Sequence, residues 1–179
     1  MSPKERVIIL IDGSNFYFKL KDLRFHNLLN FNFTEFIKLI SHSDKVVSVN
    51  YYVGGIKQDK TKHTGKLFND QQKLLSQLRK HSIKYTLGYL MKTNGKFHEK
   101  GVDIQMAVDM LVSSYEGQCS KIIIVSSDTD LLPAIKKVKE IGKIVEYVGF
   151  SHKPSIAMVS NCSESKLLTK DEIQKLISK

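Results

Sequence analysis

Short, continuous apolar runs alternate along this chain with longer stretches in which apolar residues recur at helical spacing. The runs at 7–11 and 121–125 are β-branched and end at polar turn residues, which is typical of strands buried on both faces of a parallel sheet. The predicted strands are 7–11, 46–53, 83–91, 121–125 and 143–149. Asn94-Gly95 is a tight-turn signal and predicts a hairpin extension over residues 96–98.

The helical stretches fall between these strands. The predicted helices are 16–23, 34–41, 66–80, 102–115 and 131–141, with a capping box at 169–172 that opens a short terminal helix at 171–177. The helix at 102–115 is apolar most of the way round, so we expect a core helix, and we expect a loop around Pro154. Alternating strands and helices predict an α/β fold, a three-layer sandwich with a largely parallel sheet, in one domain over residues 1–179.

Composition excludes several classes of protein. The 179 residues are 41% hydrophobic and 26% charged, which excludes a disordered or collagen-like chain. No apolar run approaches the roughly 20 residues that cross a bilayer, and residues 1–6 do not form a signal peptide, so we expect a soluble, cytoplasmic protein. Cys119 and Cys162 lie far apart without a metal-binding pattern, so we expect packing residues rather than a disulfide or a zinc site.

The formal net charge of +10 is concentrated in one segment. Residues 57–100 hold eleven Lys and Arg against three acids, with aromatic residues interleaved, a mixture that suits a surface for a nucleic-acid backbone and its bases. A solvated Lys-rich face is the alternative. Lys62, Lys66 and Lys100 are the candidate substrate-binding lysines. The Lys-rich helix also suits a contact with a second subunit, so a homo-oligomer stays open.

Four carboxylates stand at the ends of predicted elements. Asp12 ends the first strand, Asp128 follows the fourth, Asp130 begins the next helix and Asp103 lies in the first turn of the helix before that strand. The fold should bring such element ends to one edge of the sheet, where ligands bind. Clustered carboxylates are costly without a cation, and oxygen ligands suit Mg²⁺ or Mn²⁺. These ions activate water and stabilise displacement at a phosphodiester. Each acid alone also fits a cap, a turn or a helix-dipole role.

Other polar residues accompany the acids. Asn15 is suited to position a phosphate or water, and equally to cap the following helix. Asp109 lies six residues beyond Asp103, about 9 Å along the helix and about 120° around it, so we expect it in a buried network rather than on the same ion. The neutral hydrogen-bonding residues next to the acids are Ser14, Ser126, Ser127 and Thr129.

Three motifs occur in order along the chain: Ile-Asp-Gly-Ser-Asn at 11–15, Lys-Gly-Val-Asp at 100–103 with Asp109 behind it, and Val-Ser-Ser-Asp-Thr-Asp at 125–130. Together they resemble the NYN domains of the PIN-like nuclease superfamily, particularly the bacterial LabA-like branch, over about residues 7–149 and with a continuation into the C-terminal helix. The resemblance implies a metal-dependent ribonuclease with Mg²⁺ or Mn²⁺ in an acidic pocket, Asn15 as a polar partner and Lys100 near a substrate phosphate. The metal-binding, catalytic acids that it implies are Asp12, Asp103, Asp128 and Asp130.

Two main hypotheses follow. The first is a ribonuclease, a hydrolase that cuts RNA internally through its metal pocket and has no membrane partner. The second is a catalytically silent RNA-binding or protein-interaction module with a PIN-like shell. Ser127 stands where related sequences commonly have glycine, so a side chain that blocks the metal would favour the second. A dehalogenase-like or receiver-like phosphotransfer domain is disfavoured, because Ser14 replaces the second acid of the former and the strand ending at Gly54 lacks the Asp of the latter.

Overall fold

The computed structural model describes residues 4–56, 62–93 and 96–177. Two lysines of the predicted basic segment, Lys57 and Lys60, lie outside these ranges, as does the Asn94-Gly95 turn. The strands are β1 (Arg6–Asp12), β2 (Lys45–Gly54), β3 (Lys84–Thr93), β4 (Lys96–Lys100), β5 (Lys121–Val125), β6 (Ile144–Phe150) and β7 (Glu164–Leu168).

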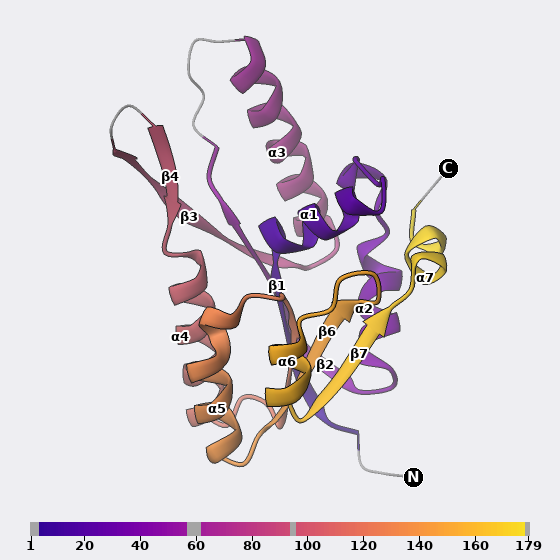
Figure 1. Ribbon diagram of the computed structural model, residues 1–179, viewed down its shortest axis with the longest axis vertical. Helices are drawn as coiled ribbons and strands as arrows, with labels where there is room; N and C mark the ends of the chain where they lie inside the picture. Colours follow the sequence, from indigo (N-terminus) through magenta and orange to yellow (C-terminus); the bar gives the residue numbers. More distant parts are fainter. Residues whose placement is uncertain (1–3, 57–61, 94–95, 178–179) are drawn as a thin grey trace.

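One sheet contains all of these strands, in the order β4-β3-β2-β1-β5-β6-β7. Figure 1 shows the hairpin of β3 and β4 on one side of the molecule and β7 on the other. Each neighbouring pair is parallel except the hairpin of β3 and β4, which is antiparallel. The chain steps outward from β1 through β2 and β3, and then returns to the other side of β1 with β5. The strand order therefore reverses between β1 and β5, the place where open α/β sheets bind ligands.

Helices cover both faces of the sheet, which confirms the predicted three-layer α/β sandwich. They are α1 (Gly13–Asp22), α2 (Phe33–Ser41), α3 (Lys62–Lys80), α4 (Val102–Tyr115), α5 (Leu132–Glu140), α6 (Ile156–Asn161) and α7 (Lys170–Lys175), with 3₁₀ turns η1 (Leu28–Asn30) and η2 (Thr129–Leu131). The first core cluster joins α1, α2, α3 and α7 to one face, and the second joins α4, α5 and α6 to the other. No helix in the described ranges is long and apolar enough to span a membrane.

The apolar run of β1 supplies both of these cores. Val7, Ile9 and Ile11 point into one cluster, and Ile8 and Leu10 point into the other. This is the alternation that a strand imposes, and it explains why the sequence of β1 has no polar position between Arg6 and Asp12. The two cysteines are free and buried, as predicted, and burial raises the pKa of the Cys162 thiol to about 11.

The structure differs from two expectations. The loop that holds Pro154 is present between β6 and α6, but α6 and β7 after it were not predicted, and β7 pairs with β6 at the sheet edge. β7 carries no continuous apolar run, since only its last residue, Leu168, is buried. The helix α4 is not enclosed by the core either. It lies in an outer layer, so its Ile104 side is 71% exposed while Met106 and Met110 on its inner side are buried.

A buried ion pair joins the amino-terminal parts of three neighbouring strands. The ammonium of Lys121 in β5 lies 2.6 Å from the carboxylate of Glu146 in β6 and 2.8 Å from that of Glu164 in β7. Burial lowers the pKa of Lys121, but the two carboxylates outweigh this effect, and the pKa is raised. Lys121 and Glu146 are both almost fully buried, so each depends on the other for its charged state.

Removing this lysine should destabilise the fold. The Lys121→Met variant leaves the Glu146 carboxylate buried without its cation, and we expect a loss of about 3–5 kcal/mol in the free energy of unfolding. Urea unfolding measures the change. Lys170→Met, an exposed lysine on α7, is the matched control and should lie within about 0.5 kcal/mol of the parent. Equal losses in the two variants would contradict a role for the buried pair.

Candidate active site

A cavity of about 350 Å³ lies at the carboxyl ends of β1 and β5, where the strand order reverses. Carboxylates from three separate segments line it: Asp12 at the end of β1, Asp128 after β5 and Asp103 in the first turn of α4. The remaining lining residues are Ser14, Asn15, Phe18, Lys100, Gly101 and Val102. The cavity therefore gathers the amino-terminal ends of α1 and α4 around a cluster of acids.

Asp12 is fixed on both of its oxygens. It caps α1, with Oδ1 accepting a hydrogen bond from the Asn15 backbone N–H at 2.9 Å, while Oδ2 accepts one from the Ser126 hydroxyl at 2.8 Å. The side chain is 5% exposed. Burial is the main cause that raises the pKa of Asp12, and the charge of Asp128 raises it further, while the hydrogen bonds oppose the shift. Asp12 is thus a carboxylate whose orientation is fixed by α1 and by the segment that follows β5.

The segment after β5 is held by a chain of local hydrogen bonds. The Ser126 hydroxyl accepts from the backbone N–H of Asp128 at 3.1 Å, and the Asp128 carboxylate accepts from the N–H of Asp130 at 2.8 Å as it caps η2. The side-chain oxygen of Asn15 accepts from the Ser127 N–H at 3.2 Å. Asn15 and Ser126 therefore link the start of α1 to this segment, which fixes Asp12 relative to Asp128.

Asp103 lines the cavity from α4, the helix that follows β4. Gly101 has φ +88° and turns the chain from β4 into α4, and a Cβ there would lie 2.7 Å from the Tyr89 ring, so the position requires glycine. Burial is the first cause that raises the pKa of Asp103, and the charges of Asp128, Asp12 and Asp130 follow. Lys100, exposed at the end of β4, lines the same cavity.

Several predicted site residues do not line the cavity. Asp130 and Thr129 are exposed on η2, although Asp130 is near enough to act on Asp103 electrostatically. Asp109 accepts hydrogen bonds from the Tyr52 hydroxyl at 2.7 Å and from the Gln105 amide at 2.8 Å. The Asp109 carboxylate is thus engaged in a side-chain network on α4.

The side chain of Ser127 points away from the acids. Its hydroxyl lies 3.0 Å from that of Tyr147 on β6, and Tyr147 also accepts a hydrogen bond from the Ser155 N–H at 3.2 Å, at the start of α6. Ser127 is absent from the cavity lining. The side chain of Ser127 therefore does not obstruct the cavity. Such an obstruction is the feature that would have favoured a catalytically silent module.

The basic segment is only partly turned toward the cavity. Of its three candidate lysines, Lys100 lines the cavity, Lys66 is exposed on α3 without lining it, and the side chain of Lys62 lies outside the described part of the chain. Arg79 lies over the Tyr85 ring, 5.7 Å from its centroid, and Lys73 is 3.9 Å from the carboxylate of Asp70. Part of the positive charge thus serves contacts within the domain.

Sequence reasoning missed two features of this site. Phe18 lines the cavity and is 60% exposed, although the flanking Phe16 and Leu20 are buried. The helical period contains the signal, because a residue two positions from each buried neighbour points outward. The role of Gly13 was also missed: a Cβ there would lie 2.3 Å from the Tyr51 ring, so the motif glycine lets α1 begin directly against β2.

The possible metal ligands that line the cavity are carboxylate, hydroxyl and amide oxygen atoms. Oxygen is the ligand that hard cations such as Mg²⁺ and Mn²⁺ prefer. Within the described ranges, no three Asp, Glu, His or Cys side chains are grouped closely enough to form a ready-made metal site. Mg²⁺ is commonly bound through one or two carboxylates together with water and substrate phosphates. The pair of Asp12 and Asp128, with Asp103 opposite, suits that mode of binding.

Comparisons with known proteins identify the family of the chain. The model of the NYN domain family matches residues 6–167. The chain belongs to the NYN domain family. This family is part of the PIN-like nuclease superfamily, so the NYN domain has a nuclease-type fold. The match covers residues 7–149, on which the resemblance rested, and continues into β7, but it ends before the terminal helix to which the resemblance was expected to extend.

A solved structure shows the same fold. A protein of unknown function from Vibrio parahaemolyticus matches with a TM-score of 0.71 and 18% identity, over 94% of this chain and 95% of that chain. Among curated proteins, no relative matches at a significant level.

The contact between Gly13 and Tyr51 can be tested by adding one methyl group. Gly13→Ala forces the Tyr51 ring or the start of α1 to move, and we expect a loss of about 1–3 kcal/mol in the free energy of unfolding. Gly65→Ala on α3 is the control: no atom lies within 4 Å of the new Cβ, so we expect a gain of about 0.5–1 kcal/mol. Thermal unfolding compares the two, and a stabilised Gly13→Ala variant would contradict the contact.

Proposed function

We propose that this NYN domain is a metal-dependent ribonuclease that hydrolyses phosphodiester bonds within RNA strands in the cytoplasm. The observation that carries the proposal is the convergence of Asp12, Asp103 and Asp128, from three separate segments, on one cavity at the strand-order reversal. Carboxylates gathered in this way repel one another unless a cation lies between them. The buried free thiols Cys119 and Cys162 are those of a protein that folds without disulfides, as expected in a reducing compartment.

The proposed ligands of Mg²⁺ or Mn²⁺ are Asp12, Asp103 and Asp128, with Asp130 at the rim of the site. Such an ion, when bound, lowers the pKa of water and stabilises charge on a phosphate undergoing displacement. Asp12 and Asp128 hold their orientation through Ser126, so the protein spends little conformational freedom when it binds a cation.

The other lining groups suit the substrate. Lys100 is placed to pair with a non-bridging oxygen of the scissile phosphate from beside the acids. Ser14 and Asn15 line the cavity in the first turn of α1, where their side chains can donate to a phosphate and the helix dipole favours one. Asn15 holds the Ser127 N–H through its oxygen, and its amide group can donate toward the substrate. The acids thus bind the cation while Lys100 and the α1 terminus orient the RNA.

Neutralising one acid should abolish cleavage while preserving the fold. In Asp12→Asn and Asp128→Asn the amide keeps a capping oxygen, and we expect cleavage of labelled single-stranded RNA with Mn²⁺ or Mg²⁺ to fall at least about 100-fold. Asp171→Asn, on the first turn of α7, is the matched control and should cleave at the parental rate. Thermal unfolding without metal should show no loss of stability in Asp103→Asn, because repulsion among the acids is relieved.

Two results would argue against the ribonuclease. Cleavage by Asp12→Asn at the parental rate would remove the acidic cavity from the reaction. No cleavage by the parent with either metal, together with intact RNA binding, would favour the catalytically silent binding module.

The proposal also predicts how RNA affinity depends on salt. Each phosphate neutralised by a lysine releases counterions, so the logarithm of the affinity should fall linearly with that of the salt concentration. Lys100→Ala and Lys66→Ala should each reduce the slope by about 0.7, measured by fluorescence anisotropy. Lys170→Ala on α7 should leave the slope unchanged. A slope that does not change in Lys100→Ala would show that this lysine does not contact a phosphate.

A further inference from the structure

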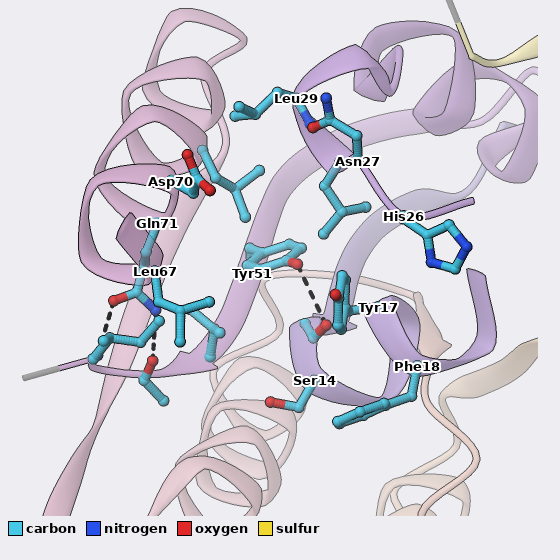
Figure 2. A pocket seen from close by; sticks show the side chains of 16 residues that line it. Ser14, Tyr17, Phe18, His26, Asn27, Leu29, Tyr51, Leu67, Asp70 and Gln71 are labelled. Carbon is cyan, nitrogen blue, oxygen red and sulfur yellow. Dashed lines mark hydrogen bonds between the residues drawn. The ribbon is translucent and has the colours of Figure 1, made fainter. Parts of the chain in front are cut away.

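A second cavity, of about 460 Å³, is shown in Figure 2 and adjoins the acidic one. It lies between α1, the η1 turn, the end of β2 and α3. Ser14 and Phe18 line both cavities, so the two share one wall at the start of α1. The volume lies within the range of small-molecule sites in proteins. Nothing in the mechanism proposed above uses this second cavity.

Flat aromatic and leucine side chains form most of its walls. The rings of Tyr17 and Phe18 lie edge to face, with centroids 5.6 Å apart, and Tyr51 forms another wall. Leu67 of α3 lines the cavity and is 43% exposed, and Phe18 is 60% exposed. Folding alone gives no reason to keep an aromatic ring in water at the junction of two cavities. A planar ring that enters the cavity would bury the exposed apolar side chains at this junction.

A few polar groups interrupt these walls. The Gln71 amide is fully engaged with the backbone: it donates to the Gly54 carbonyl at 2.7 Å and accepts from the Ile56 N–H at 2.9 Å, which fixes the end of β2 (Figure 2). Asn27 accepts from the Leu29 N–H through its oxygen, and its NH₂ group is a donor. Asp70 adds an acceptor. A site of this kind binds a planar heterocycle by its faces and reads its edge.

We propose that this cavity binds one unpaired nucleobase of an RNA strand whose neighbouring phosphate lies at the acidic cavity, an inference that rests on the proposed function. Base and phosphate are joined through a single ribose, so a base site must share a boundary with the phosphate site, as Ser14 and Phe18 do here. A base inside the cavity cannot also pair within a duplex. The substrate class is therefore single-stranded RNA or a loop, with the base stacked on Phe18, Tyr17 beside it, and the edge of the base toward Asp70 and Asn27.

The first test uses uncharged ligands, so that neither metal nor phosphate enters the measurement. Adenosine, cytidine, uridine, guanosine and ribose are titrated into the parent protein, and methyl and aromatic signals are followed by NMR. We expect at least one nucleoside to shift the signals of Leu67 and Tyr17, while ribose shifts neither. Phe18→Ala should weaken that binding at least about fivefold, the effect of losing one stacking ring. Tyr115→Ala removes an aromatic residue of similar exposure, 62%, on α4 and should not change it.

A second pair of variants guards against an indirect effect of Phe18 on the acidic cavity. Leu67→Ala alters a leucine that lines the second cavity alone, and Leu87→Ala alters a leucine of β3 with nearly the same exposure, 45%. We expect weaker nucleoside binding only in the first. The proposal is overturned if no nucleoside shifts the cavity signals, which is the result expected of a cavity that binds an apolar protein side chain instead. It is also overturned if both leucine variants bind nucleosides like the parent.

Cleavage of RNA then separates this inference from the proposed function. The parent should cleave an oligonucleotide with one abasic position more slowly at the adjacent bond than the intact strand, and Leu67→Ala should reduce this difference. If metal-dependent cleavage is equally fast at the abasic position and in the intact strand, the base site is overturned and the ribonuclease is not. Nucleoside binding without any cleavage would overturn the ribonuclease and leave the base site intact.

Discussion

The complete enclosure of β1 is the constraint on which the rest of the structure depends. This strand pairs with β2 on one side and β5 on the other, and helices cover both of its faces, so every residue from Val7 to Asp12 is buried and only Arg6, at its amino end, is exposed. Because both neighbours are parallel to it, their carboxyl ends emerge beside Asp12. The acidic cavity is thus a consequence of the strand order. The backbone arrangement alone brings Asp12 to this edge of the sheet.

Charged side chains are compensated differently at the two ends of the sheet. At the amino-terminal ends, the chain itself supplies both signs: Lys121 faces Glu146 and Glu164, and these charges contribute to folding. At the carboxyl ends, the charges that most affect Asp103 are other carboxylates, and Lys100 remains exposed at the edge. Like charge that the fold leaves uncompensated supports the proposal that a ligand binds at the carboxyl ends. This argument does not depend on any relative.

The sequence was most informative where one residue type has one physical use. The β-branched runs of β1 and β5 could only be buried strands, and the acids that follow them had to lie at one edge. Signals were weak where burial is slight. β7 buries a single leucine, and α6 buries only Met158 within its six residues, so neither shows a periodic pattern. The direction of Ser127 depends on Tyr147, whose position follows from the pairing of β6. Tertiary contacts of this kind leave no mark in the local sequence.

The close fit of Gly13 against Tyr51 has an evolutionary consequence. These positions are 38 residues apart, yet the ring occupies the space that a side chain at position 13 would need. Neither position can therefore drift independently: a larger residue at 13 becomes tolerable only after the ring at 51 has shrunk. Tyr51 also forms a wall of the second cavity, so such an exchange would reshape that cavity at the same moment. Divergence within the family at this pair of positions should thus occur in concert, and it would change the shape of the cavity together with the packing.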